Sequence, residues 1–318
     1  MDTKKGRVLL LRFGGLGDLL AVLPSISYLR KTMPDKEFTL VCREEYGRLF
    51  QDAGLVDQLV PVGGRKTAAL FGADPETACW AERFGLAVAW MQKPPGLWLE
   101  ESLRSMSIPE VRTIALPAFV SVPISRFFFD RTASFIPGAG APGPGFDECA
   151  RLAVSERAAA SAHRLRLGVG GGLEPFAVVH PGSGGESKCW PLGNFLEIVR
   201  RLADRGMPGI LVTGDAEERP SFSGPLESGG VPPRWTWLRK PELCTLAALL
   251  AKALFYIGND SGITHLAAAC GAKVLALFHE DMEAAWRPFG LTRVVAARTL
   301  PEISVDRVWL TISEGKFF

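Results

Sequence analysis

A carboxylate directly follows a cluster of glycines near the start of the chain. The stretch "RFGGLGDLLAVLP" (residues 12–24) has three glycines within four residues, immediately before Asp18. Glycine loops that open a helix often bind phosphate, but a carboxylate would repel one. Asp18 therefore either caps the predicted helix or accepts a hydrogen bond from a substrate hydroxyl, which the small glycines allow to approach. It can do both only if one of its oxygens remains available.

A second glycine-rich loop carries a lysine. In "HPGSGGESKCWP" (180–191) the backbone amides could wrap a diphosphate, Ser183 supplies a hydroxyl and Lys188 a positive charge. An ammonium can neutralise the charge that develops on a leaving phosphate. A solvated surface lysine would explain the residue equally well. Trp190 either packs at the start of the following helix or stacks on a base.

A third loop, "DSGITH" (260–265), also opens a predicted helix. Asp260 is the expected N-cap, and Ser261 and Gly262 expose amides that could hold a phosphate. Asp260 could instead accept a hydrogen bond from a sugar hydroxyl. The side chain of His265 faces either the ligand or the core.

An acidic loop, "DAEERP" (215–220), follows another predicted strand. An acid just beyond a strand end can accept hydrogen bonds from both hydroxyls of a ribose. Glu217 is the first candidate for that contact and Asp215 the second, although a solvated charged loop would have the same sequence.

Hydrophobic patterns predict that each of these loops follows a buried strand. Short apolar runs alternate with helical patterns along the chain, which predicts α/β domains with parallel sheets covered on both faces. The expected strands are 7–13, 37–43, 57–62, 86–91, 111–116, 176–180, 209–214, 254–259 and 273–278. The helix after residue 16 contains Pro24, which predicts a kink or a delayed start. A second helix is expected at 191–206.

The composition changes to a glycine- and proline-rich stretch between about residues 136 and 175. This segment indicates a connection between two domains, which we place at 1–165 and 166–318. Open parallel sheets bind ligands beyond the carboxyl ends of their strands. We therefore expect two domains that face a ligand-binding cleft.

The overall charge excludes some classes of partner. The 318 residues are 47% hydrophobic and carry a net charge of +2, which gives no general attraction to nucleic acid. Six cysteines without a CxxC pair predict reduced thiols in a cytoplasm, and neither a disulfide framework nor a metal site. The basic N-terminus is expected to be retained rather than cleaved as a signal peptide, and no apolar run is long enough to span a membrane.

Two common nucleotide motifs are missing from these loops. Gly15 and Gly17 begin a G-x-G-x-x-G pattern, but Leu20 stands where the third glycine belongs, and there is no Gly-Lys-Ser/Thr triplet. The first absence disfavours a nicotinamide-dependent dehydrogenase, and the second excludes a P-loop.

Taken together, the three loops resemble glycosyltransferase family 9, the heptosyltransferases of lipopolysaccharide core synthesis. "GGLGDLLAVLP" looks like the family's G-D-x-x-x-x-x-P opening, "HPGSGGESKCWP" like its H-P-G and Lys-x-Trp-Pro motif, and "GNDSGITHLAAACGAKVLALF" like its Asp-[Ser/Thr]-Gly-x-x-His helix start. The motifs occur in the family's order and span most of the chain.

The resemblance implies a GT-B fold, in which two Rossmann-like doubly wound domains face a central cleft. It implies an acceptor-binding N-terminal domain and a nucleotide-sugar-binding C-terminal domain. The expected reaction is inverting transfer of a sugar, expected to be heptose, from an ADP-sugar to a lipopolysaccharide-core or related glycan acceptor, with no cofactor and no essential metal.

Roles are carried over where the motifs match. Asp18 would be the general base on the acceptor hydroxyl, and Lys188 would contact the donor's phosphate and sugar. The expected donor contacts are Gly17, Gly182, Ser183, Glu217, Asp260, Ser261, Gly262 and His265. The family often continues Gly-Pro-Thr where this chain has residues 279–281, "HED", a difference that bears on donor preference.

Two further interpretations remain open. The stretch "SRFFFDRTASF" (125–135) is either an interior strand or buried loop, or a surface that touches a lipid-linked acceptor or the inner membrane. The expected location is cytoplasmic, at most peripheral at that membrane's inner face. The rivals to a transferase are a nucleotide-sugar epimerase on the same fold and a non-catalytic nucleotide-sugar-binding relative.

Overall fold

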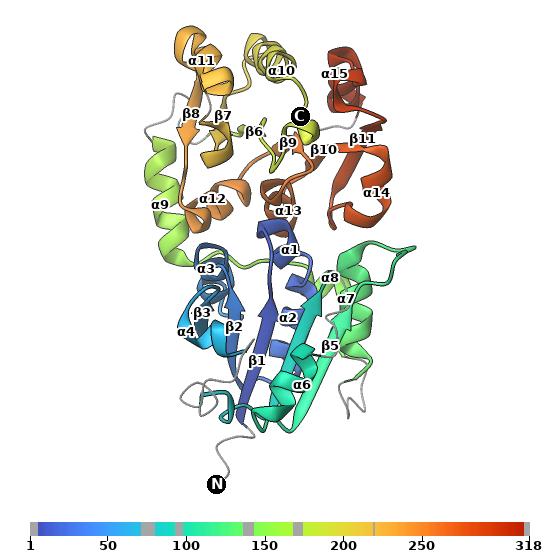
Figure 1. Ribbon diagram of the computed structural model, residues 1–318. Coiled ribbons are helices and arrows are strands. Elements are labelled where there is room, and N and C mark those ends of the chain that lie inside the picture. Colours follow the sequence, from blue (N-terminus) through green and yellow to red (C-terminus); the bar gives the residue numbers. More distant parts are fainter. Residues whose placement is uncertain are drawn as a thin grey trace. The chain divides into compact units, whose positions relative to one another are not determined.

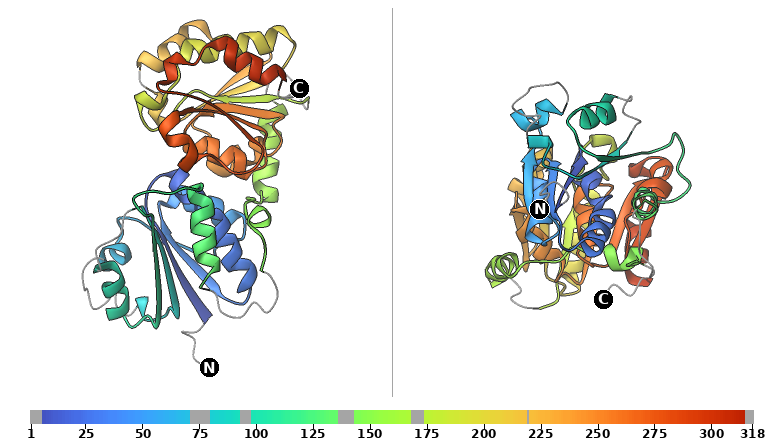
Figure 2. Two further views of the ribbon diagram at one scale, coloured as in Figure 1. Left: turned by 90° about the vertical axis from the view of Figure 1, so that its right-hand side faces the viewer. Right: turned by 90° about the horizontal axis from the view of Figure 1, so that it is seen from below.

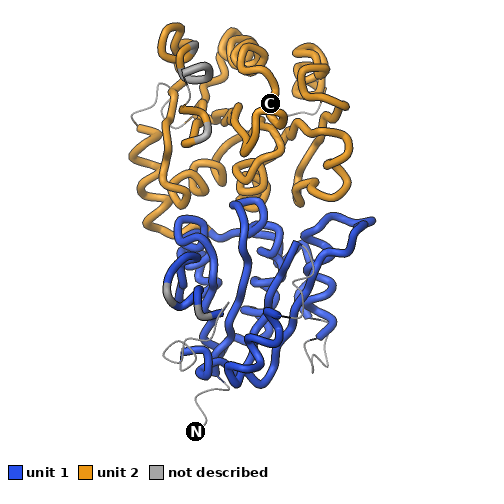
Figure 3. Tube along the Cα trace, in the orientation of Figure 1, with its two compact units in different colours: residues 1–153 blue, residues 154–318 orange. Residues whose placement is uncertain are grey.

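The chain forms two compact units, each built on one parallel β-sheet. The computed structural model describes residues 6–70, 80–92, 98–135, 143–167, 174–218 and 220–314. The first unit comprises residues 1–153 and the second residues 154–318 (Figure 3). The division lies before the boundary that we expected at 165/166, because α9 (Glu156–Leu167) packs against α12 (Leu243–Leu250) of the second unit.

The sheet of the first unit has five parallel strands in the order β3-β2-β1-β4-β5. The strands are β1 (Arg7–Arg12), β2 (Glu37–Cys42), β3 (Gln58–Pro61), β4 (Leu86–Met91) and β5 (Glu110–Ala115). The central strand β1 is buried on both faces, which explains its continuous apolar sequence. The order reverses between β1 and β4, so the loops after these two strands leave the sheet in opposite directions.

Helices cover both faces of this sheet (Figure 2). Leu9 and Leu11 of β1 pack on the face that carries α6 (Trp98–Ser105). The opposite face carries α2 (Leu23–Thr32), which contacts α7 and α8. The other helices described in this unit are α1 (Leu16–Leu20), α3 (Glu44–Asp52), α4 (Arg65–Ala69), α7 (Ile124–Ala133) and α8 (Phe146–Cys149).

The sheet of the second unit has six parallel strands in the order β11-β10-β9-β6-β7-β8. The strands are β6 (Ala177–His180), β7 (Gly209–Thr213), β8 (Trp235–Arg239), β9 (Phe255–Asn259), β10 (Val274–His279) and β11 (Thr292–Ala297). Numbered from β6, this is the strand order of the doubly wound dinucleotide-binding fold. The reversal lies between β6 and β9.

Two groups of helices enclose this second sheet (Figure 1). The core on one face is formed with α10 (Leu192–Asp204), α11 (Pro220–Gly229) and α15 (Val305–Glu314). On the other face α12 contacts both α9 and α13 (Gly262–Ala269). Among the described residues, the second unit also has α14 (Glu280–Trp286) and the short 3-10 helices η2 (Glu186–Lys188), η3 (Asp215–Glu217) and η4 (Leu300–Glu302).

The predicted strands are confirmed, and the two domains are α/β as expected. The prediction for Pro24 is also confirmed, because α1 ends at Leu20 and a new helix begins at Leu23 with the proline in its first turn. Strands β8 and β11 were not predicted. Both lie at sheet edges, where one side of a strand faces solvent or loops and the apolar run is short.

The prediction for 125–135 as an interior strand or buried loop was wrong, because Ile124–Ala133 form helix α7. Phe128, Phe129 and Thr132 are buried, a helical spacing. On the exposed side Arg126 pairs with Asp130 one turn later, at 2.8 Å. The three consecutive phenylalanines concealed this period.

Gly209, the first residue of β7, allows a tryptophan to pack against the backbone. A Cβ built there would lie 2.5 Å from the Trp235 ring, whose indole N–H donates to the carbonyl of Met207 at 2.9 Å. We expect Gly209→Ala to cost about 1 to 3 kcal/mol through overpacking. The melting temperature should fall by roughly 2 to 4 °C per kcal/mol, measured by circular dichroism.

Gly193→Ala is the matched control, because a Cβ at this position in the first turn of α10 meets nothing within 4 Å. It should leave the melting temperature unchanged or raise it slightly. Equal effects of the two substitutions would contradict the role assigned to Gly209.

Candidate functional site

Asp18 lies in the first turn of α1, just after the loop that follows β1 and beside the reversal in the first sheet. Helix α1 begins after Gly15, so Asp18 is the third helical residue and not the N-cap. Its Oδ2 accepts a hydrogen bond from the backbone N–H of Gly15 at 2.8 Å. Asp18 therefore does cap the helix, but it reaches back from within the first turn, as the acidic residue of a capping box does.

The other carboxylate oxygen of Asp18 is bonded to a buried cation. The Arg12 guanidinium donates from Nη2 to Oδ1 at 3.0 Å, and its side chain is 1% exposed. Gln92, just after β4, also donates to Oδ1. Burial lowers the pKa of the Arg12 guanidinium, and the negative charge of Asp18 partly offsets this effect. Residues that follow β1 and β4 thus meet at one carboxylate.

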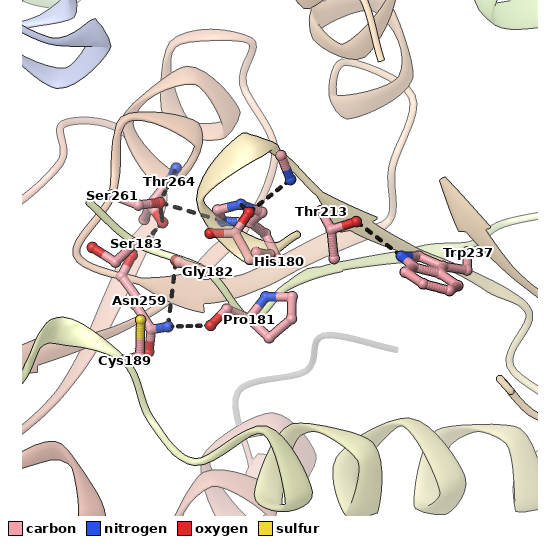
Figure 4. A network of polar contacts seen from close by, with 12 residues as sticks. His180, Pro181, Gly182, Ser183, Cys189, Thr213, Trp237, Asn259, Ser261 and Thr264 are labelled. Carbon is pink, nitrogen blue, oxygen red and sulfur yellow. Dashed lines mark hydrogen bonds and ion pairs between the residues drawn. The ribbon is translucent and has the colours of Figure 1, made fainter. Parts of the chain in front are cut away.

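In the second unit, the loops after β6 and β9 are held together by Asn259 (Figure 4). This side chain is fully buried. Its Nδ2 donates to the carbonyl of Pro181 at 2.8 Å, and its Oδ1 accepts from the backbone N–H of Trp190 at 3.0 Å. One amide side chain therefore connects both ends of the lysine-bearing loop to the last residue of β9.

Three predicted site residues add to this connection. Ser183 donates its hydroxyl proton to the backbone carbonyl of Asp260 at 2.6 Å. Lys188 pairs with the Asp260 carboxylate at 2.8 Å, with side chains 44% and 10% exposed respectively. The structure thus brings together Lys188, Ser183 and Asp260, and Lys188 is not merely a solvated surface lysine.

The expectation that Asp260 caps α13 was wrong, because Ser261 is the N-cap. Ser261 has an extended backbone, and its Oγ accepts from the N–H of Thr264 at 3.3 Å. The Asp260 carboxylate is turned to Lys188 instead. Gly262 is the first helical residue. A serine cap leaves the start of the helix uncharged, which suits an anion better than an aspartate cap would.

Glu217 lies beyond the end of β7, where an acid was predicted to meet a ribose. It is 4% exposed, and its Oε2 accepts from the backbone N–H of Gly214 at 2.6 Å. A side chain at Gly182 would clash with this carboxylate, so Gly182 provides room for it. Asp215, the second candidate, is largely exposed and pairs with Lys240 at 2.7 Å.

A histidine that was not predicted lies between Glu217 and the start of α13. His180, the last residue of β6, is buried, and its Nε2 lies 3.8 Å from Glu217 Oε2. Its Nδ1 is 3.5 Å from the Ser261 hydroxyl (Figure 4). The ends of β6, β7 and β9 are thereby in polar contact.

The aromatic residues near these loops belong mainly to the core. Trp190 is fully buried, donates to the carbonyl of Ile303 at 2.8 Å and packs edge-on against Phe195. It does not serve as a base-stacking platform. His265 is buried with its ring edge-on to Trp286. Gly17, predicted as a donor contact, lies in α1 of the first unit.

Sequence reasoning missed four polar residues of these sites: Arg12, Gln92, His180 and Asn259. Three of them end a buried strand and the fourth, Gln92, directly follows one, so a polar side chain ends each apolar run. Such an interruption is a usable signal. Within the described ranges, no group of three or more His, Cys, Asp or Glu is placed to hold a metal ion. No helix of the described chain is long and apolar enough to cross a bilayer.

Relatives and solved structures support the fold. The chain is 23% identical over 303 residues to lipopolysaccharide heptosyltransferase 3 of Escherichia coli K12. This alignment covers 86% of this chain and 82% of that protein. It superimposes on the family 9 glycosyltransferase of Veillonella parvula with a TM-score of 0.79 at 17% identity, covering 100% and 98% of the two chains. The E. coli ADP-heptose lipopolysaccharide heptosyltransferase II gives 0.73 at 17%, covering 97% and 98%.

A more distant structural neighbour is described as iron-containing. This heptosyltransferase, TibC, gives a TM-score of 0.54 at 13% identity and covers 98% of this chain and 76% of its own. These likenesses establish the GT-B fold class for the chain.

The model of one protein family, glycosyltransferase family 9 (heptosyltransferase), matches residues 131–304. This match covers the second, third and acidic loops that carry most of the candidate residues. Since it spans more than half of the 318 residues, the chain belongs to glycosyltransferase family 9, as its motifs predicted.

Proposed function

We propose that this glycosyltransferase moves a heptose, with inversion, from an ADP-sugar to a lipopolysaccharide-core or related glycan acceptor. The names of two relatives support the choice of donor and acceptor, since one acts in lipopolysaccharide synthesis and the other is an ADP-heptose enzyme. One observation carries the proposal: Lys188 and Ser183 both contact Asp260, just before α13. These contacts lie where the strand order of the second sheet reverses, between β6 and β9.

These residues suit the diphosphate of the donor. Lys188 offers a cation that Asp260 holds at 2.8 Å, and its 44% exposure leaves it accessible to a ligand. The amides at the start of α13, which begins at Gly262, offer further donors to an anion. Together they would stabilise the charge that builds up on ADP as the bond to the sugar breaks.

Asp18 would act on the acceptor. In the proposed reaction the acceptor oxygen forms a bond to the anomeric carbon while the bond from that carbon to the β-phosphate oxygen breaks, with its electron pair leaving on ADP. The proton of the acceptor hydroxyl passes to the Asp18 carboxylate. Inversion follows because the base and the leaving group act on opposite faces of the sugar.

The expectation of metal-free catalysis remains part of the proposal. Lys188 and the start of α13 would supply the positive charge that a divalent ion supplies in other transferases. Turnover that persists unchanged in excess EDTA would support this, and loss of turnover that Fe²⁺ restores would favour an iron-dependent enzyme instead.

We also propose a cytoplasmic location with a peripheral contact at the inner membrane. Helix α7 gives little support to that contact, because Phe128 and Phe129 are buried and Arg126 is paired. The loop before α7 gives more, since Phe119 is 82% exposed. Co-sedimentation of the protein with anionic liposomes, compared with Phe119→Ser, would test it.

The assay of the proposed function is acceptor-dependent release of ADP. A nucleotide-sugar epimerase would convert donor without acceptor, and a non-catalytic relative would bind donor and release no ADP. A thermal-shift screen of ADP, UDP, GDP and NAD identifies the nucleotide first, because a ligand raises the melting temperature according to its concentration relative to Kd.

Asp18→Asn should reduce kcat by about 10²- to 10⁴-fold, because the amide cannot take up the acceptor's proton. The Kd for ADP-sugar should not change, because Lys188, Ser183 and Asp260, which are assigned to the donor diphosphate, lie in the second unit. The matched control is Asp57→Asn. The Asp57 carboxylate, just before the edge strand β3, bonds Arg30 and the backbone amide of Phe38. Retained turnover in Asp18→Asn with normal donor binding would exclude Asp18 as the base.

Asn259→Asp tests the connection between the donor loops. The new carboxylate would face the Pro181 carbonyl in a fully buried position, so we expect a loss of about 3 kcal/mol of stability at pH 7.5. A protonated carboxyl could donate to that carbonyl, so folding should raise its pKa above the unfolded value. The destabilisation should therefore be small near pH 4 and grow as the pH rises.

Chemical denaturation of the wild type and the variant at pH 4.5 and 7.5 measures this difference. Asn194→Asp, in the first turn of α10 and only partly buried, is the control and should change stability by at most about 0.5 kcal/mol. A pH-independent loss in Asn259→Asp would argue against the hydrogen bond from Asn259 to Pro181.

A further inference from the structure

Arg12 is a buried cation that the proposed reaction does not use. Its side chain is 1% exposed, at the end of the central strand β1. The guanidinium donates from Nε to the backbone carbonyl of Asp18 at 2.9 Å, from Nη1 to the carbonyl of Trp90 at 3.1 Å and from Nη2 to Asp18 Oδ1 at 3.0 Å. Its carbon Cζ lies 5.2 Å from the centre of the Phe128 ring.

These contacts fix the guanidinium in one orientation. The Trp90 carbonyl belongs to β4, and Phe128 belongs to α7, so the cation is held by three elements at once. Trp90 is itself fixed, because its indole N–H donates to Thr132 of α7 at 3.0 Å. Arg12 is too deeply buried to touch a substrate, and any effect on the reaction must pass through Asp18.

The two oxygens of Asp18 are bonded unequally. Oδ1 accepts hydrogen bonds from Arg12 and Gln92, and among the described residues Oδ2 accepts one, from the Gly15 amide. A carboxylate has about four lone-pair sites, two on each oxygen. The remaining capacity therefore lies on Oδ2.

The space around the two oxygens is also unequal. A Cβ built at Gly14 would lie 2.5 Å from Oδ2, and one at Gly15 would lie 3.7 Å from it. Gly14 also has a φ of +123°, a conformation that L side chains rarely adopt. Backbone without side chains therefore borders Oδ2, where an incoming hydroxyl would need room.

We propose that Arg12 is a positioning residue that holds Oδ1 of Asp18, with help from Gln92, so that Oδ2 is the atom that takes the acceptor's proton. This inference rests on the proposed function, because it assigns the base within that reaction to one oxygen. It also resolves the conflict between the two roles of Asp18, since capping uses one lone pair of Oδ2 and the acceptor hydroxyl uses the other.

The test compares Arg12→Gln with Arg30→Gln in the full chain. Arg30 is a matched control: its guanidinium also bonds a carboxylate, that of Asp57, donates to the carbonyls of Leu55 and Lys36, and lies over a ring, that of Phe38. It has no contact with Asp18. For each variant, kcat and KM are measured by acceptor-dependent ADP release and corrected for the folded fraction.

We expect Arg12→Gln to lower kcat per folded molecule by about 10²-fold, because small displacements of a reacting group can cost that much. Arg30→Gln should leave kcat unchanged, and neither variant should alter the Kd for ADP-sugar. Combined with Asp18→Asn, Arg12→Gln should cost no further activity, because both act on one step. If Arg12 had a purely structural role, the fold-losses in kcat of Arg12→Gln and Asp18→Asn would multiply in the double variant.

Gln92→Ala provides a second variant if Arg12→Gln folds poorly, because Gln92 is exposed and bonds the same oxygen. We expect a smaller fall in kcat, roughly 3- to 10-fold, with stability unchanged. Normal kcat in both variants, or a loss that persists in the Asp18→Asn background, would overturn the inference while leaving the transferase function intact. Absence of acceptor-dependent ADP release in the wild type would instead refute the proposed function, and this inference with it.

Discussion

The order of strands in a parallel sheet decides where polar side chains can gather. Two neighbouring strands whose chain connections run in opposite directions leave their following loops free to bind a ligand, and each sheet here has one such pair. β1 and β4 bring Asp18 and Gln92 together, and β6 and β9 bring Lys188 and Asp260 together. The middle residues of β1 and β9 are buried, and the charged and amide side chains of Arg12 and Asn259 lie at the ends of these strands.

Burial imposes a second constraint, because each charge near these strand ends needs a partner. Removing a charged group from water costs several kcal/mol unless an opposite charge and hydrogen bonds compensate it. Arg12 is compensated by Asp18 and two carbonyls. Lys188 is compensated by Asp260 but remains 44% exposed. The difference suits different roles: a fully enclosed cation can only hold another residue, whereas a half-exposed one can bind a ligand.

Much of this architecture could be predicted because central strands of parallel sheets have distinctive sequences. β1, β6, β9 and β10 are largely apolar before their last residue since both faces are covered, and the glycine-containing loops that follow β1, β6 and β9 are easy to locate. The edge strands β8 and β11 lack that pattern and were missed. The strand or buried loop expected at 125–135 is a helix, because adjacent phenylalanines hide a helical period.

Within the sites, residue types were easier to predict than their partners. The sequence motifs pointed to Lys188 and Asp260 separately, but their pairing depends on how the loops after β6 and β9 meet. Asn259 connects those loops through two long-range contacts that no local pattern contains. Capping by Asp18 was foreseen, yet its position in the helix was not, because Gly15 is the N-cap and glycine is also an accepted N-cap residue.

The two roles first considered for Asp18 are compatible because of its surroundings. An aspartate at the N-cap would be fixed by the helix alone, whereas one in the third helical position reaches back over Gly15 and across to Arg12. The cap then orients the carboxylate from one side and the guanidinium from the other. The capping donor is the backbone N–H of Gly15, so no side chain is needed beside Oδ2. Gly14 and Gly15 therefore leave room next to its remaining lone pair. The glycine cluster and Asp18 therefore act together. The glycines give the carboxylate a backbone donor and also leave space beside it.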